Sequence, residues 1–145
     1  VLRQPIAGRG VANPFCAGFV PQGPEITSRA ADAGDGHSVS LFVALGRFET
    51  VIMGDLNWNK EFELMCPTNP VGQVDLYLVS HHGSDTSGSA ALVHALGARA
   101  AVMNNGPRKG GAAATLRLLR SAPGFVDLWQ NHYAIPAGRD LNTAD

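Results

Sequence analysis

Hydrophobic and polar positions along the chain predict a β-hairpin followed by helices and strands in turn. Residues 38–45 and 48–53 form two apolar runs separated by Gly46-Arg47, which is the pattern of two strands joined by a tight turn. Beyond this hairpin, short apolar runs alternate with segments of helical periodicity. We expect strands at 75–80, 99–104, 126–129 and 133–135, and helices at 60–65, 89–96 and 110–121. This order predicts an α/β layered sheet.

Residues 1–36 differ from the rest of the chain because they are rich in Gly, Pro, Ala and Asn and have no sustained period. We predict an irregular amino-terminal segment over 1–36 and a folded α/β unit over 37–145. A structureless stretch of this length is unusual in a complete compact domain. It therefore suggests that part of the fold lies outside this chain.

Polar residues flank the predicted helices. Asn57 or Asn59 is placed to cap the helix at 60–65. Before the helix at 89–96, the pattern predicts turn and N-cap residues at Ser84, Asp85, Ser87 and Ser89.

Composition narrows the class of protein. The chain has 145 residues, 45% of them hydrophobic, and a formal net charge of −1. This is enough apolar material for one packed domain, and the charge gives no sign of nucleic-acid binding. The sequence has no apolar run of the roughly 18 residues that a membrane helix needs. A cytoplasmic and a periplasmic or secreted location both remain open.

Two cysteines, Cys16 and Cys66, are too few for a disulfide scaffold. One bridge between them and two buried thiols are both consistent with the sequence, because spacing alone does not fix their geometry.

The carboxyl ends of three predicted strands carry the polar residues of greatest chemical interest. Asp55 follows the strand at 48–53, His81 and His82 follow the strand at 75–80, and the strand at 99–104 leads to Asn105 and Lys109. Ligands of open α/β sheets bind in the crevice outside the strand ends. A carboxylate combined with imidazoles suits a transition metal such as zinc. The sequence thus predicts a metal site formed by Asp55, His81 and His82.

Each of these residues also has a plainer interpretation. Asp55 is placed to act as a helix or turn cap for the segment that follows it. Adjacent strand residues point to opposite faces, so one of His81 and His82 would ligate while the other donates a hydrogen bond or packs beneath the sheet, unless a turn at Gly83 relaxes this constraint. Of the other histidines, His37 is expected in a turn, His94 in helix packing or at the surface, and His132 either in a site wall or at a strand edge.

Three segments carry a resemblance to a known family. GDLNWNKE (54–61), DLYLVSHHGSDTS (75–87) and AVMNNGPRKGG (101–111) resemble the metallo-β-lactamase-fold hydrolases, in the branch related to the hydrolase domain of ComEC-type DNA-uptake proteins. The resemblance extends over roughly residues 35–133. It implies that the chain is the carboxy-terminal half of a four-layer αββα sandwich.

The resemblance also implies a metal centre. Asp55 matches the family's Asp that bridges two metal ions, commonly zinc, and His81 and His82 match residues of the same active-site face. The family's hallmark motif HxHxDH belongs to the amino-terminal half of the fold and does not occur in this chain. Where ComEC-type proteins often have His-Pro after an Asn-Gly turn, this chain has Lys109, which we expect to contact substrate instead.

Two functions follow as expectations. The first is a metal-dependent hydrolase, incomplete in this chain, in which metal-activated water attacks an ester, amide or phosphodiester of a small molecule or of a phosphodiester substrate. In that interpretation Asp55, His82 and Lys109 are catalytic, and Asn105, Lys109 and His132 bind substrate. The second is a non-catalytic binding or structural module that keeps the fold half without a catalytic metal centre.

The predicted strand at 75–80 is apolar on both faces. If the helices cover one face of the sheet, the other face is an exposed apolar surface of the kind that drives association. We therefore expect a homodimer, association with the missing amino-terminal half, or coverage by residues 1–36.

Overall fold

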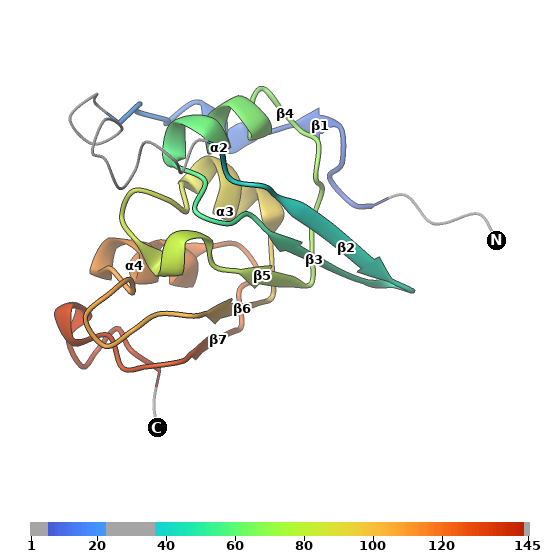
Figure 1. Ribbon diagram of the computed structural model, residues 1–145. Coiled ribbons are helices and arrows are strands. Elements are labelled where there is room, and N and C mark those ends of the chain that lie inside the picture. The colour runs from blue at the N-terminus through green and yellow to red at the C-terminus, as the bar shows by residue number, and fades with distance from the viewer. Residues whose placement is uncertain (1–5, 23–36, 144–145) are drawn as a thin grey trace.

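The computed structural model describes residues 6–22 and 37–143 (Figure 1). Its elements in chain order are β1 (Val11–Ala12), η1 (Pro14–Cys16), β2 (Leu41–Leu45), β3 (Phe48–Ile52), α2 (Trp58–Met65), β4 (Thr68–Asn69), β5 (Leu76–Leu78), η3 (Ser80–Gly83), α3 (Ala90–Leu96), β6 (Ala100–Met103), α4 (Ala113–Ser121), β7 (Asp127–Gln130) and η4 (Ile135–Ala137), where η marks a 3₁₀ turn.

One mixed sheet of five strands, in the order β2-β3-β5-β6-β7, organises the fold. β2 and β3 form the antiparallel hairpin that the sequence predicts, with Gly46 at a positive φ of 62° in its turn. β3, β5, β6 and β7 are parallel to one another. The chain is therefore an α/β protein, as expected. None of the helices among the described residues is long and apolar enough to cross a membrane.

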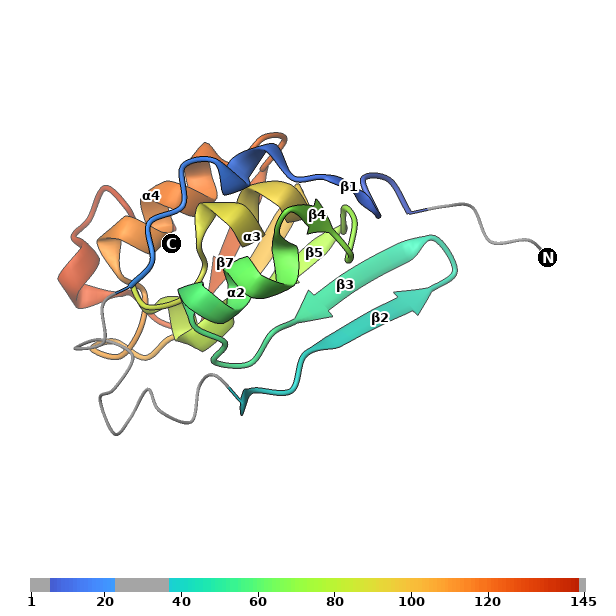
Figure 2. The ribbon, with the colours of Figure 1, turned by 90° about the horizontal axis from the view of Figure 1, so that it is seen from above.

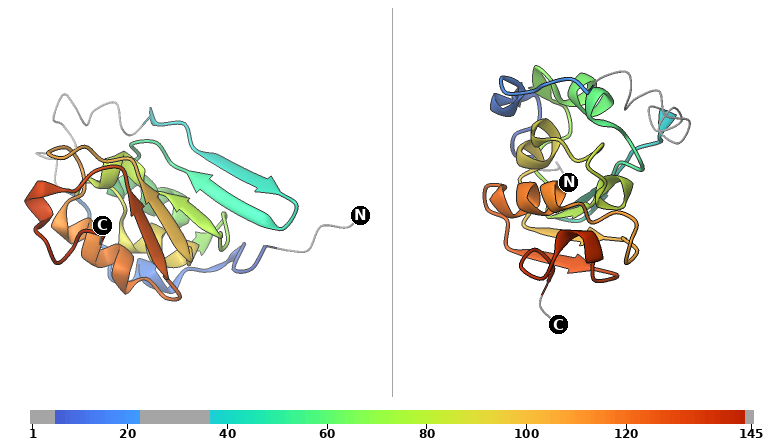
Figure 3. Two further views of the ribbon diagram at one scale, coloured as in Figure 1. Left: turned by 90° about the horizontal axis from the view of Figure 1, so that it is seen from below. Right: turned by 90° about the vertical axis from the view of Figure 1, so that its left-hand side faces the viewer.

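The helices α2, α3 and α4 lie on one face of this sheet (Figures 2 and 3). The strand register places Val51, Tyr77, Ala101 and Leu128 in one row across four strands, and each is at most 4% exposed. This row packs with Leu92, Leu96, Leu116 and Leu119 of the helices in the hydrophobic core. The core thus lies between the sheet and its single layer of helices.

The opposite face carries a second row of five apolar side chains, one from each strand: Leu41, Ile52, Leu78, Val102 and Trp129. We call this surface the open face. No helix in the described part of the chain covers it (Figure 3). Leu41 and Trp129, at its two edges, are 53% and 65% exposed. The expectation of an apolar sheet face that the helices leave bare is confirmed for these residues.

Element boundaries differ from the predicted ones mainly by shortening of the strands. Residues 38–40 precede β2 without joining it, and 133–135 do not form a strand. The Asn142 side chain accepts a hydrogen bond from Ala134 N and donates one to Ala134 O, at 2.7 and 3.1 Å. Because these backbone groups are already paired, the segment does not need a neighbouring strand.

The described part of the amino-terminal segment, residues 6–22, is tied to the helical layer. β1 pairs with β4, and the buried Asn13 side chain donates hydrogen bonds to Met65 O and Ala91 O. Cys16 and Cys66 form a disulfide. The prediction of irregular coil is therefore wrong for β1 and η1, whose structure depends on partners 50 or more residues away. Residues 1–5 and 23–36, also assigned to this coil, lie outside the described residues.

Candidate functional site

The loops after β3, β5 and β6 meet at one edge of the sheet, as the order of the strands predicts. His81 N donates a hydrogen bond of 3.0 Å to Gly54 O, next to Asp55. Gly111 N donates one of 2.9 Å to His82 O. The backbone segments that carry Asp55, the two histidines and Lys109 are thereby held in a continuous group.

His81 and His82 both adopt the left-handed conformation, with φ values of 50° and 56°, and Gly83 follows at 79°. Left-handed backbone is uncommon for residues with a side chain, and two in succession store strain of roughly 1–3 kcal/mol each. Gly suits position 83 because its φ is positive and because a Cβ there would also lie 3.1 Å from the backbone N of Gly111. Because His81 and His82 lie in this turn and not in a strand, their side chains need not point to opposite faces of the sheet. The two imidazole centroids are 6.3 Å apart.

Hydrogen bonds orient both rings through Nδ1. His82 Nδ1 lies 3.1 Å from Asn104 O. Because a carbonyl only accepts, we assign the proton to Nδ1 and the lone pair to Nε2. His81 Nδ1 lies 3.2 Å from both Ser87 Oγ and Thr86 Oγ1. A metal-binding histidine commonly has such a partner on its other ring nitrogen.

Asp55 does not cap α2. The N-cap is Asn57, whose side chain accepts a hydrogen bond of 3.1 Å from Lys60 N, one of the two caps that the sequence allowed. Asp55 N instead donates to Ser38 Oγ at 3.1 Å. The helix-cap interpretation of Asp55 is therefore wrong. The same contact places the segment around His37 beside this edge, a proximity that the sequence did not indicate.

The predicted substrate-binding residues surround the loop after β6. Lys109 is exposed, and its carbonyl accepts a hydrogen bond from Gly106 N. Asn105 is only 2% exposed, and its amide nitrogen donates to Gly106 O and His132 O. The side chain of His132 is exposed. Asn105 thus links the Lys109 loop to the His132 segment from beneath.

Among residues 6–22 and 37–143, no three His, Cys, Asp or Glu side chains lie together in a group that could hold a metal ion. Backbone hydrogen bonds bring the segments of Asp55, His81 and His82 together, but their side chains do not form a group of three metal ligands. His94, as expected, is a packing residue, with Nε2 3.3 Å from Leu118 O and its ring edge-on to Phe15.

We call the left-handed turn at His81, His82 and Gly83 the histidine turn. Two buried residues that the sequence did not single out support it and the loop that follows it. Glu61 is fully buried and accepts hydrogen bonds of 2.7 Å from Gly88 N and from Ser89 N. Burial raises the pKa of Glu61 from its ordinary value of 4.5 to about 7, although these two donors oppose the rise. Ser89 is the N-cap residue of α3 but makes no side-chain capping bond, and its backbone N–H is one of the two donors to Glu61.

Tyr77 is the second of these residues. Its hydroxyl lies 2.6 Å from Ser80 Oγ and accepts a hydrogen bond of 3.0 Å from Ser80 N. Burial, and then the charge of Glu61, raise the pKa of Tyr77. Tyr77 therefore fixes the first residue of the η3 turn. Periodicity identifies it as a core residue but not as a support of the site.

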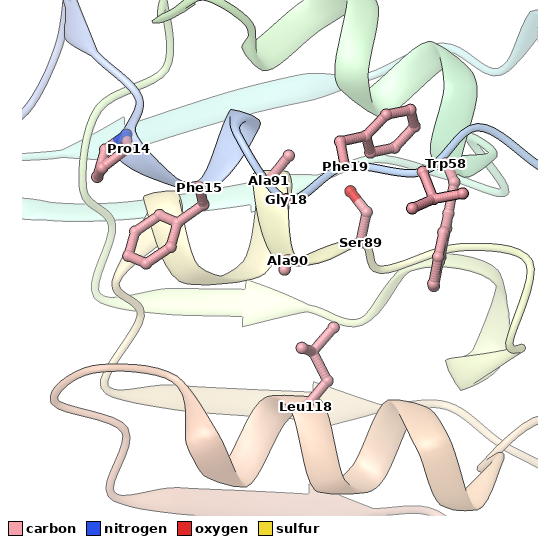
Figure 4. A pocket seen from close by; sticks show the side chains of 10 residues that line it. Pro14, Phe15, Gly18, Phe19, Trp58, Ser89, Ala90, Ala91 and Leu118 are labelled. Atoms are coloured by element: carbon pink, nitrogen blue, oxygen red, sulfur yellow. The ribbon is translucent and has the colours of Figure 1, made fainter.

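A separate apolar pocket of about 430 Å³ lies on the helical side of the molecule (Figure 4). It contains none of the predicted site residues. Its walls are Pro14, Phe15, Gly18, Phe19, Val20, Trp58, Ser89, Ala90, Ala91 and Leu118.

Comparison of the chain with models of known protein families, with curated proteins and with solved structures found no match. A functional assignment therefore depends on the residues of the site itself.

Proposed function

We propose that this chain supplies part of the active site of a metal-dependent hydrolase, with Asp55, His81 and His82 facing the metal. The observation that carries the proposal is the pair of consecutive left-handed histidines at the sheet edge. Strain of this kind is retained where a side chain must point in a particular direction, and it is concentrated at functional sites. A turn with a purely structural role would be more stable with Gly or Asn at these positions.

The donor set fits zinc. Carboxylate oxygen and imidazole nitrogen are ordinary zinc ligands, and the Nδ1 contact of His82 leaves its Nε2 lone pair for a ligand. When bound, zinc would supply Lewis-acid chemistry, which activates water at neutral pH. Asp55 and the histidines would hold the ion. The exposed Lys109 ammonium would bind an anionic oxygen of the substrate, and His132 would border the site on the same side.

Asn105 has a supporting role in this proposal, because its amide is buried. The Asn105 amide donates a hydrogen bond to Gly106 O, and Gly106 N donates one to the Lys109 carbonyl. The position of Lys109 thus depends on Asn105. The substrate class is an ester, an amide or a phosphodiester.

The same proposal includes a specific fold, in which the described sheet is the carboxy-terminal half of a four-layer αββα sandwich. The apolar row of the open face supports this, because a second sheet packed on it would bury Leu41, Ile52, Leu78, Val102 and Trp129. That layer would also provide further metal ligands, as the resemblance to metallo-β-lactamase-fold hydrolases implies. Its source would be an amino-terminal half, or a second copy of the chain.

Zinc titration by calorimetry, combined with assays on bis(p-nitrophenyl) phosphate and p-nitrophenyl acetate, tests the proposal. We expect stoichiometric zinc binding that Asp55→Asn and His82→Asn each weaken by about 10-fold or more. His94→Gln is the matched control, since His94 contacts α4 and Phe15 rather than this edge. Equal binding in all three variants would contradict the proposal.

The open face also favours a second candidate, a non-catalytic binding module. Such a module would use its apolar surface for a protein partner and would not need the metal centre. Absence of both zinc binding and turnover, in protein whose open face is occupied by a partner, would support the module over the hydrolase.

A further inference from the structure

Glu61 holds the loop that connects the histidine turn to α3. Its two carboxylate oxygens accept hydrogen bonds of 2.7 Å from consecutive backbone donors, Gly88 N and Ser89 N. Glu61 itself is on α2, 27 residues earlier in the chain, and has no exposed surface. A buried carboxylate bound in this way fixes the end of the loop rigidly, because the loss of either bond leaves a polar group unsatisfied.

The same loop carries the groups that orient His81. Thr86 Oγ1 and Ser87 Oγ both lie 3.2 Å from His81 Nδ1. Thr86 O also accepts a hydrogen bond of 3.0 Å from Trp58 N, at the start of α2. The imidazole is thus connected through the loop to two positions on α2.

His82 has a different support. Its Nδ1 contacts Asn104 O, at the end of β6, and its carbonyl accepts a hydrogen bond from Gly111 N. Neither contact involves Glu61 or residues 84–89. The Nδ1 contacts of the two adjacent imidazoles therefore lie on different segments, Thr86 and Ser87 for His81 and Asn104 for His82.

We infer that Glu61 is a positioning residue for His81: by clamping Gly88 and Ser89 it fixes the Thr86 and Ser87 hydroxyls, which set the orientation of the His81 ring at the sheet edge. The inference depends on the proposed function only for the role of His81 as a ligand. A simpler role for Glu61, as an N-cap of α3 supplied from another helix, predicts a loss of stability without a specific effect on His81.

The test is the Glu61→Gln variant. The Gln amide keeps one acceptor oxygen but turns an N–H donor toward the second backbone N–H, which loosens one of the two bonds at nearly unchanged volume. The first measurement is the pair of imidazole ¹⁵N resonances of each histidine in zinc-free protein. The second is the zinc dissociation constant.

We expect the His81 resonances to move toward those of a freely rotating imidazole, while those of His82 stay in place. We expect the zinc dissociation constant to rise by about 10-fold. The double variant Thr86→Val/Ser87→Ala removes the hydroxyls directly and should reproduce the His81 change. Adding Glu61→Gln to it should have little further effect on His81, because both changes act on one pathway.

Leu128→Ala is the matched control, since it weakens the core at β7 without touching the loop. Unchanged His81 resonances in Glu61→Gln, or equal changes at His81 and His82, would overturn the inference. If Glu61→Gln does not fold, Glu61→Asp serves, since it keeps the carboxylate but shortens its reach. A His81 response without zinc binding would overturn the metal proposal and leave the positioning role standing.

Discussion

Cys16 and Cys66 form a disulfide with Cα atoms 5.9 Å apart, which joins the amino-terminal segment to the end of α2. The two cysteines are 50 residues apart in the sequence. Asn13 reinforces it nearby through its hydrogen bonds to Met65 O and Ala91 O. The segment that carries Cys16 also forms one wall of the apolar pocket in Figure 4.

Removal of this disulfide should lower the free energy of unfolding. Closing a loop of this length restricts the unfolded chain, so we expect Cys16→Ser/Cys66→Ser to lose about 2–4 kcal/mol in urea denaturation. A reductant should lower the stability of the wild type to a similar degree and leave the double variant unchanged. Equal midpoints for the oxidised wild type and the variant would contradict the bridge.

Glu61 should make stability depend on pH. Its pKa is raised from 4.5 to about 7 in the folded protein, so the folded state binds more protons than the unfolded state between these values. Stability should be fully present below about pH 4 and fall as pH rises through 7, by up to about 3 kcal/mol. Glu61→Gln cannot titrate and should show a flatter pH profile over this range. Parallel profiles for the two proteins would contradict this assignment.

The open face should drive association. Charged substitution at its exposed edges, in Leu41→Lys/Trp129→Lys, should reduce concentration-dependent self-association in light scattering and reduce binding of an apolar dye. Val126→Lys is the control, since Val126 is 69% exposed but lies outside the row. Monomeric wild type without dye binding would contradict an exposed apolar face.

The backbone strain at His82 should appear as a difference in stability between two variants of this residue. Gly adopts φ of 56° without the steric penalty that a Cβ incurs. We therefore expect His82→Gly to be more stable than His82→Ala by about 1 kcal/mol in thermal or urea unfolding. Both variants remove the same imidazole, so the difference isolates the backbone. A more stable His82→Ala would show that the left-handed conformation is not retained.

The sequence determined the features that depend on neighbouring residues. Periodicity and turn residues predicted the hairpin at Gly46, the three helices, a cap at Asn57 or Asn59, and the order of helices and strands along the chain. Because that order sends successive strand ends to one edge, it also predicted that the segments of Asp55, His81 and His82 would meet there. These signals are local, since each residue's preference depends on positions within a few places of it.

Only the tertiary structure decided the rest, because the deciding contacts join residues far apart in the chain. Glu61 has the sequence pattern of an ordinary helical residue, and its role depends on Gly88 and Ser89, 27 and 28 positions away. The pairing of Cys16 with Cys66 depends on how residues 6–22 cross the helices. The left-handed turn at His81 and His82 forms because Gly54, Asn104 and Gly111 hold it from two neighbouring loops, against the local preference of both residues.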